Sequence, residues 1–382
     1  MTGKERVAIA LALGTPDRVP FGEYAIDYDT VERIIGHETY VRAKARCQVA
    51  VWEGRRDEMV QSLIEDGIAL FRALDDVVDI INLHSLWFAE VPGKDEPVVA
   101  PRRLDDTTWE YANGAILKYS DVTGDFTVVH DPEKWTRQYR AEDFSLEPNG
   151  EPVDESRYEV VDAIIAEFSR DKFIIGGFPM AVELPLLGDM ERGLYEMATA
   201  PEVVARYAES SLAWARAQQC LWRNRGYDAA IDGTDFSSQR QPLISPAMFQ
   251  RFCFPNLKAN VEAVHAHGLR FIQHACGHNW PLLDAFMEAG VDCYQSVQES
   301  AGMVPGEVKK YCQGRMAIWG GVRVENLVSG SSEDVRDDVR RAMATAKPGG
   351  GYVFGSSHSI AVGTKYDNFM AMLDEFVRWR DY

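Results

Sequence analysis

Long hydrophobic runs are missing from this 382-residue sequence. No apolar stretch approaches the roughly 20 residues that a membrane-spanning helix needs, so we expect no membrane protein. The one segment that imitates a secretory signal, Val7 to Leu13, is short and is closely followed by Asp17 and Arg18. We therefore interpret it as an amphipathic first helix and expect a cytoplasmic protein.

Positive charge is scarce as well, because 40 lysines and arginines stand against 59 aspartates and glutamates, which gives a net charge of −19. Such a chain repels phosphate groups, which argues against a nucleic-acid-binding surface, and we expect no nucleic-acid partner. The six cysteines follow no regular spacing, and a domain of this size does not need disulfides for its stability. We expect them to be reduced thiols.

A glycine-rich dinucleotide-binding turn after the first predicted strand is also absent. What the chain does contain is an ordinary globular composition, with 46% hydrophobic and 26% charged residues. Short apolar runs alternate with helical patterns, of which the longest are near 40–70 and 201–225. We predict strands near 18–24, 77–84, 172–178, 228–235, 270–276, 291–298, 316–321 and 351–355.

Strands that alternate with helices pair in parallel through right-handed crossovers. So many units in one chain favour a closed barrel over an open sheet, and we predict an α/β fold, a (β/α)8 TIM-type barrel, as a single domain over residues 1–382. Residues 1–75 would supply an N-terminal helical segment and the first strand. We interpret residues from about 90 to 155 as an insertion, in which Asn113-Gly114 predicts a small antiparallel β-hairpin.

Catalytic groups of such barrels lie at the carboxyl ends of the strands. Polar residues collect at or just after the predicted strand ends, namely Asp232, Asp235, His274, Cys276, Gln298 and His358. We predict acid–base roles for Asp235 and His358, and substrate contacts for Asp232 and Gln298. The two aspartates could equally cap the loop that follows their strand.

A metal site is the most specific chemistry that these residues indicate. His274 and Cys276 point to the same face of their strand, because residues i and i+2 do so. Imidazole and thiolate together suit zinc, and a catalytic zinc takes about three protein ligands. His358 is the best third ligand. A bare His-x-Cys pair also arises from chance or packing, so the residues alone leave the metal open.

Aromatic residues make up 11% of the chain. Tyr24, Phe178 and Trp319 fall near predicted strand ends, and His84 ends another strand. We predict that these four side chains line the substrate pocket. Packing in the core is the ordinary role of such aromatic residues, and His84 could instead hydrogen-bond a loop.

Several short motifs occur in order along the chain: TGKERV at 2–7, PDRVP at 16–20, DGTD at 232–235, PLISP at 242–246, HACG at 274–277 and GGYVFGSSH at 350–358. Together they resemble the uroporphyrinogen decarboxylase superfamily, over nearly the whole chain apart from the insertion. The resemblance implies a barrel and one of two chemistries.

The decarboxylase branch grips the carboxylates of a tetrapyrrole with arginines near its first strand. Residues 21–29 here contain Glu23, Asp27 and Asp29 but no arginine. Three acids would repel a polycarboxylate substrate, so this chemistry is disfavoured.

The HACG motif resembles the cobalamin-dependent methyltransferase branch, which carries zinc on a His-x-Cys pair and a later cysteine. The resemblance implies zinc on His274 and Cys276, with His358 in place of the later cysteine. It also implies an O-demethylase-like transfer of a methyl group from a small methoxylated donor to a corrinoid, and the aromatic residues favour an aromatic donor. Because the chain lacks an Asp-x-His-x-x-Gly corrinoid motif, the corrinoid would arrive on a separate partner protein.

Three other functions stay open. The first is a metal-free lyase like uroporphyrinogen decarboxylase that uses Asp232, Asp235 or His358 as acid and base. The second is the reverse transfer, from a methylcorrinoid to a thiol or folate. The third is a non-catalytic binding barrel, which would not need polar residues at so many strand ends. The sequence is compatible with a homodimer but does not indicate the oligomeric state.

Overall fold

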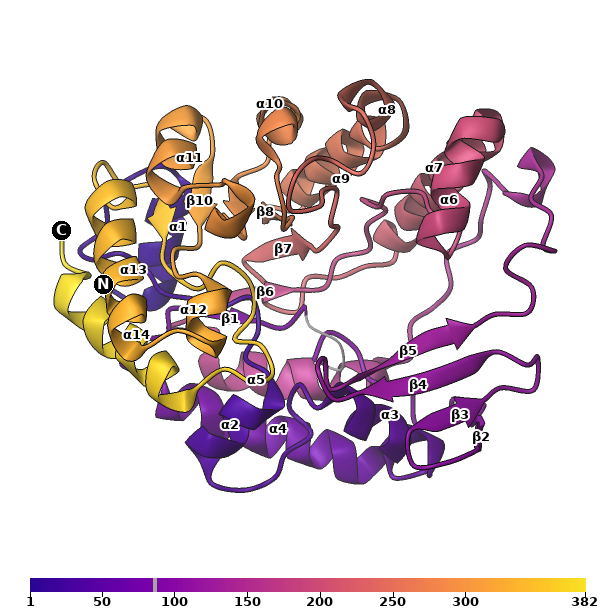
Figure 1. The fold of residues 1–382 in the computed structure, drawn as a ribbon, viewed down its shortest axis with the longest axis horizontal. Helices are drawn as coiled ribbons and strands as arrows, with labels where there is room; N and C mark the ends of the chain where they lie inside the picture. Colours follow the sequence, from indigo (N-terminus) through magenta and orange to yellow (C-terminus); the bar gives the residue numbers. More distant parts are fainter. Residues whose placement is uncertain (85–87) are drawn as a thin grey trace.

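A curled parallel sheet forms the centre of the computed structural model, which describes residues 1–84 and 88–382 (Figure 1). Within these ranges it has seven strands, and each pairs in parallel with the next along the chain. Their bounds are β1 (Ile80–Asn82), β6 (Phe173–Gly176), β7 (Ala229–Asp232), β8 (Arg270–His274), β9 (Cys293–Gln295), β10 (Ala317–Trp319) and β11 (Tyr352–Val353). The predicted α/β fold with a TIM-like parallel sheet is confirmed.

An extended segment, residues 18–26, lies between β11 and β1, where a first strand was predicted. The Phe21 carbonyl accepts a hydrogen bond from the Asp79 amide at 2.9 Å, and on the other side the Gly22 amide donates to the Phe354 carbonyl at 3.1 Å. On the β11 side the pairing of Phe21 with Phe354 is an isolated bridge and not part of a regular ladder. A full eight-stranded barrel is therefore not confirmed, although hydrogen bonds cross the gap between β11 and β1.

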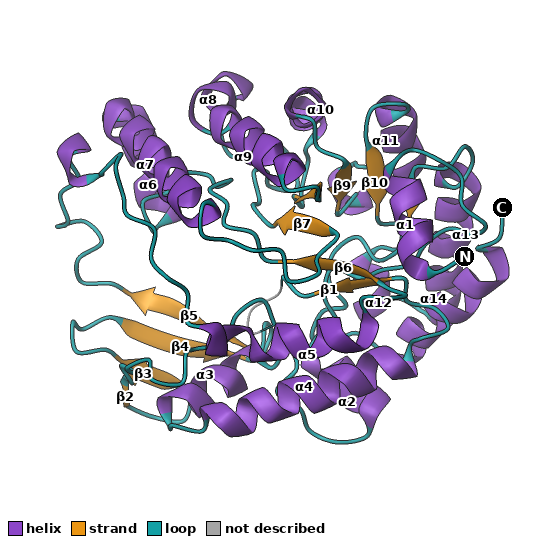
Figure 2. Cartoon of the chain, turned by 180° about the vertical axis from the view of Figure 1, so that it is seen from behind, coloured by secondary structure: helices purple, strands orange, loops and turns teal. Residues whose placement is uncertain are grey.

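Helices cover the outer side of the sheet (Figure 2). Their bounds are α1 (Gly3–Leu11), α2 (Tyr28–Ile35), α3 (Lys44–Trp52), α4 (Arg56–Ala73), α5 (Glu159–Phe168), α6 (Met190–Thr199), α7 (Pro201–Gln219), α8 (Pro246–Phe252), α9 (Phe254–Ala266), α10 (Leu283–Ala289), α11 (Pro305–Cys312), α12 (Val324–Val328), α13 (Ser332–Ala346) and α14 (Tyr366–Trp379). The helix predicted for 40–70 is two helices, because Gly54 adopts a left-handed φ of +72° between α3 and α4. No described helix is long and apolar enough to cross a membrane.

Apolar side chains fill the amino-terminal part of the inner face of the sheet. They come from every strand: Ile80, Phe173, Ile175, Ala229, Ile231, Ile272, Cys293, Ala317, Trp319 and Val353. Val7, Ala10 and Leu11 of α1 pack against them and close that end. Side chains two residues further along a strand face the same way, so His274 and Gln295 follow Ile272 and Cys293 on the inner face. The packed interior thus ends in polar residues at the carboxyl end, which we call the mouth.

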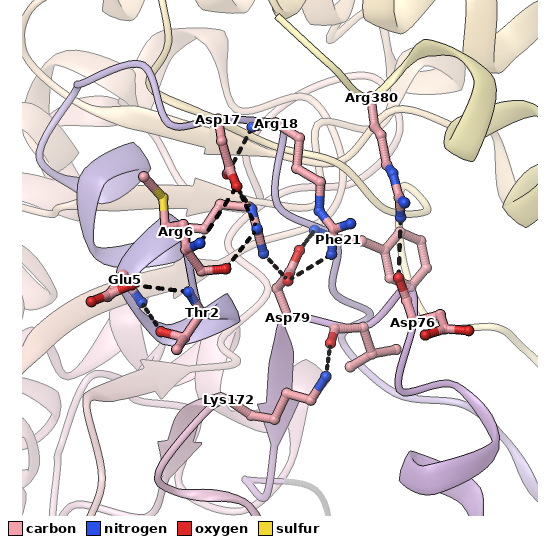
Figure 3. A network of polar contacts seen from close by, with 12 residues as sticks. Thr2, Glu5, Arg6, Asp17, Arg18, Phe21, Asp76, Asp79, Lys172 and Arg380 are labelled. Carbon is pink, nitrogen blue, oxygen red and sulfur yellow. Dashed lines mark hydrogen bonds and ion pairs between the residues drawn. The ribbon is translucent and has the colours of Figure 1, made fainter.

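A polar network fixes the opposite, amino-terminal end (Figure 3). The Arg6 guanidinium lies between Asp17 and Asp79, with N–O distances of 2.7 and 2.6 Å. The second oxygen of Asp79 accepts the Phe21 amide at 3.0 Å. This network holds α1, the extended segment and the start of β1 together.

The insertion forms a separate antiparallel sheet beside α3 (Figure 1). Its strands are β2 (Arg102–Arg103), β3 (Thr108–Glu110), β4 (Ile116–Ser120) and β5 (Asp125–His130), paired in that order. The hairpin predicted at Asn113-Gly114 joins β3 to β4, and Gly114 has the left-handed φ of +84° that this turn needs. Trp52 of α3 anchors the sheet by packing on Phe126, with ring centroids 5.2 Å apart. The hairpin is thus part of a larger sheet of four strands.

Candidate active site

Three aromatic rings meet at the mouth. His274 ends β8, Tyr24 belongs to the extended segment, and His358 follows β11. The Tyr24 ring stacks on the His274 ring with centroids 4.1 Å apart, and the His358 ring stands edge-on to His274 at 5.2 Å. We call these residues the ring cluster. Burial raises the pKa of Tyr24 to about 12, so its hydroxyl keeps its proton.

One hydrogen bond decides the protonation of His274. Its Nδ1 bonds Oε1 of Gln295, the last residue of β9, and an amide oxygen only accepts. Nδ1 therefore carries the proton, and the lone pair of Nε2 is left free. Burial lowers the pKa of His274, and the neighbouring His358 lowers it further, so the ring is neutral at pH 7. Nε2 lies 3.7 Å from Oδ1 of Asp235.

Asp235 joins the ring cluster to Cys276. Its Oδ1 accepts the Cys276 amide at 3.0 Å, and half of its side chain is exposed at the mouth. Burial, with Asp235 nearby, raises the pKa of the Cys276 thiol to about 12. Burial also lowers the pKa of His358. Two neutral imidazoles, one thiol and one carboxylate therefore gather here.

These donors match zinc in their chemistry, since zinc takes neutral imidazole, thiolate and carboxylate ligands. Gln295 on Nδ1 of His274 is the kind of outer partner that orients a ligating histidine. As the side chains stand, no three His, Cys, Asp or Glu residues of the described chain are grouped to hold a metal ion. Binding would therefore need these side chains to come closer together.

Asp232 is buried at the end of β7. It accepts hydrogen bonds from Nε2 of Gln273 at 2.6 Å and from the Thr234 amide at 3.0 Å. Burial raises its pKa to about 7. Because Ile231 faces the interior, Asp232 points to the opposite face of the strand, towards the helices. Its contacts are those of the loop cap that the sequence left open, and a role in substrate binding stays a prediction.

The other predicted pocket residues lie at different depths. His84 is close enough to His274 to lower the pKa of that ring, and burial lowers the pKa of His84 itself to about 4. Its Nδ1 is buried without a hydrogen-bond partner among the described residues. Gln298 spans the mouth loops, because its Oε1 accepts the Gly277 amide at 2.8 Å.

Phe178 and Trp319 are not brought to the ring cluster by direct ring contacts. Phe178 packs against Trp222 and His267, with centroids 4.8 and 5.1 Å apart. Trp319 is fully buried in the packed interior, and its indole donates to the Gly22 carbonyl at 2.9 Å. Trp319 thus supports the mouth from below.

Comparison with known proteins supports the superfamily that the motifs resemble. Residues 196–379 match a family model described as uroporphyrinogen decarboxylase (URO-D). The carboxyl-terminal part of the chain is thus similar to the uroporphyrinogen decarboxylase superfamily. Its structure is also similar to that of a methyltransferase from Methanosarcina mazei, with a TM-score of 0.66, 15% sequence identity and 99% of both chains covered. At this identity the structural likeness shows a shared fold, and no curated protein matches the sequence.

The part of the chain that matches the superfamily model holds most of the predicted site. It contains Asp232, Asp235, His274, Cys276, Gln298, Trp319 and His358. Tyr24, His84 and Phe178 lie outside it. The resemblance to the superfamily is confirmed, whereas membership of its methyltransferase branch stays a prediction.

Two ionisable residues that the sequence did not single out as site residues lie beside the ring cluster. Glu23 is buried, and burial raises its pKa to about 8. Arg42 comes from the connection between α2 and α3, and its Nε donates to Asp27 at 2.9 Å. Glu23 could have been predicted as a site residue, because a carboxylate inside a predicted buried strand is unusual. No local pattern places Arg42 here, because a left-handed φ of +58° turns the chain at that residue.

A cavity with about 30 Å³ of free space borders Tyr24, enough for one or two water molecules. Its lining is mainly apolar, with Glu23, Arg42 and Asn82 as the polar members. The apolar lining comes from Ala25, Ile26, Val41, Leu70, Phe71, Val78, Ile80 and Phe88. An apolar group is therefore the kind of ligand that fits beside Tyr24.

Proposed function

We propose that this protein is a zinc-dependent methyltransferase, which moves a methyl group from a methoxylated aromatic compound to the corrinoid of a separate protein. The observation that carries the proposal is the state of His274, neutral, with Nδ1 bonded to Gln295 and Nε2 free beside Asp235 and Cys276. The superfamily and the fold shared with a methyltransferase support it.

His274 Nε2, the Cys276 thiolate and His358 would hold the metal, with Asp235 beside them. Bound zinc would act as a Lewis acid on the ether oxygen and make it a better leaving group. The Cys276 thiol must lose its proton to become a ligand. Asp235 accepts that proton, because its carboxylate already lies against Cys276 and opens to solvent.

The chain's own residues also orient the methyl donor. Tyr24 offers an aromatic face at the mouth and, with its pKa near 12, a hydroxyl that donates a hydrogen bond. The small apolar cavity beside it suits a methyl group. The mouth stays accessible at Asp235, where the corrinoid of the partner protein would approach.

Metal content tests this proposal directly. Protein purified without a chelator or a metal-binding tag should hold about one zinc per chain. His274→Ala and Cys276→Ser should lose it, and His358→Ala should weaken it. Cys220→Ser removes an exposed thiol at the end of α7 and serves as the matched control, with zinc unchanged. A folded protein with no zinc would end the proposal, and zinc should otherwise accompany demethylation of aryl methyl ethers by a corrinoid protein.

A metal-free lyase is the second candidate, and one observation favours it. Asp232 has a pKa of about 7, which suits acid–base catalysis at neutral pH. Asp235 and His358 would be its partners. Activity that survives Cys276→Ser but is lost in Asp232→Asn would identify this chemistry. The reverse methyl transfer, from a methylcorrinoid to a thiol or folate, would also use zinc. Only an assay with each pair of methyl donor and acceptor distinguishes it from the first proposal.

A further inference from the structure

Glu23 and Ser356 form a buried contact behind His358. The Ser356 amide donates to Oε1 of Glu23 at 3.0 Å, and the Ser356 hydroxyl bonds Oε2. The same hydroxyl donates to the carbonyl of His358 at 2.8 Å. Glu23 is 7% exposed and Ser356 is fully buried, so water does not replace these bonds.

The hydrogen atoms of this contact can be counted. A serine hydroxyl has one proton to donate, and the His358 carbonyl can only accept. When the Ser356 proton goes to that carbonyl, its oxygen must accept the bond from Oε2 of Glu23. Glu23 then carries the proton and donates. No ion pair to Glu23 is found among the described residues, and Arg42 is engaged by Asp27, so a neutral acid also avoids an uncompensated buried charge.

The close approach of two glycines brings the two residues together. A Cβ at Gly355 would lie 2.2 Å from the Gly22 carbonyl oxygen, so the two backbones meet where only glycine fits. Glu23 and Ser356 are the next residues along each backbone. Ser357 holds the other side of the loop, because its carbonyl accepts the Ser296 hydroxyl at 2.7 Å.

We propose that Glu23 is a positioning residue, a neutral carboxylic acid that acts through Ser356 to set the loop of His358 and thereby the angle of that imidazole against His274. Its place in catalysis rests on the proposed function, but its effect on His358 does not. Only two peptide bonds separate Ser356 from His358, so a shift of this loop moves His358 directly.

The NMR resonance of the His358 Cε1–H group in the full-length protein tests the effect of Glu23 on this ring. The resonance is assigned by its disappearance in His358→Ala. Glu23→Gln keeps a donor and an acceptor in the same shape and should leave the resonance at its wild-type position. Glu23→Ala and Ser356→Ala should both move it, and the double variant should move it no further than either. Thr30→Ala is the control, since its buried hydroxyl has no partner among the described residues.

Either of two results overturns the proposal. Glu23→Gln could shift the resonance as far as Glu23→Ala does, which would mean that Glu23 is not a neutral donor. Alternatively, Glu23→Ala and Ser356→Ala could both leave it in place. If Glu23→Ala fails to fold, the two single variants Ser356→Ala and Glu23→Gln provide the same test.

Activity separates this inference from the proposed function. In an active methyltransferase, Ser356→Ala should lower kcat on the order of 10- to 100-fold with little change in KM, as for a misplaced catalytic group. A protein without zinc that still shows the NMR pattern would overturn the methyltransferase proposal and leave the positioning role of Glu23 standing.

Discussion

Single hydrogen bonds determine the chemical state of the residues at the mouth. Gln295 takes Nδ1 of His274 and leaves Nε2 for a ligand or a proton. Ser356 takes both oxygens of Glu23 and passes one hydrogen bond on to the His358 backbone. Both partners are fully buried, so the two histidines of the ring cluster are oriented by side chains that do not themselves reach the reacting atoms.

Removing the acceptor on His274 should weaken metal binding. In Gln295→Leu the imidazole loses the partner that fixes its tautomer and ring angle. Zinc affinity should fall by about 10- to 100-fold, the usual cost of losing such an outer partner. Gln219→Leu, at the end of α7, should leave the affinity unchanged. The measurement is competition with a zinc chelator, and equal affinity of Gln295→Leu and wild type would contradict it.

Replacing Glu23 with glutamine should change the pH dependence of stability. The folded-state pKa of Glu23, about 8, lies above the ordinary 4.5, so the folded protein binds this proton more tightly than the unfolded chain does. That contribution is complete below pH 4.5 and is lost as the pH rises through 8. Wild type should therefore lose a few kcal/mol relative to Glu23→Gln between pH 5 and pH 9, at about 1.4 kcal/mol for each pKa unit.

Urea denaturation of both proteins at several pH values measures this difference in the free energy of unfolding. Asp232 titrates identically in both, so it cancels in the comparison. A constant difference across the range would mean that Glu23 is already ionised in the folded protein at pH 5.

At the scale of elements, the extended segment 18–26 occupies the place of a strand between β11 and β1, although it makes few backbone hydrogen bonds. Its neighbours hold it through side chains: Asp79 binds the Phe21 amide and Arg6 at one end, and Glu23 meets Ser356 at the other. The segment carries Tyr24 to the ring cluster, so the packing of α1 and the geometry of the mouth are connected through it.

The buried ion pair between Arg6 and Asp79 should contribute more to the free energy of unfolding than the partly exposed pair between Arg6 and Asp17. Asp79→Ala leaves the Arg6 guanidinium and the Phe21 amide without their buried acceptor. It should lower the free energy of unfolding on the order of 3–5 kcal/mol. Asp17→Ala is the matched control, because the Asp17 side chain is 44% exposed and should cost no more than about 1 kcal/mol. Chemical denaturation measures both, and equal losses would contradict the argument.

At the scale of the whole molecule, the alternation of strand and helix was sufficient to predict the parallel order of the sheet. The apolar run at 270–276 correctly put His274 near a strand end, and the motif order indicated the superfamily. The same reasoning could not show that residues 18–24 form isolated bridges and not a regular strand. A run of hydrophobic residues indicates that a segment is buried, but it does not indicate how its backbone is hydrogen-bonded. It could not place Arg42 or link Glu23 to Ser356 either, because those contacts depend on three-dimensional closure.

The bond between Glu23 and Ser356 spans 333 residues of sequence. Closing such a loop carries a large entropy cost, and the contact is available only when nearly the whole chain has been synthesised. The inner sheet can form strand by strand as the chain leaves the ribosome, but Tyr24 and His358 meet only when the last strand arrives. The site is thus assembled at the end of folding, and a chain that stops short of β11 would carry His274 and Cys276 without the partners that complete the mouth.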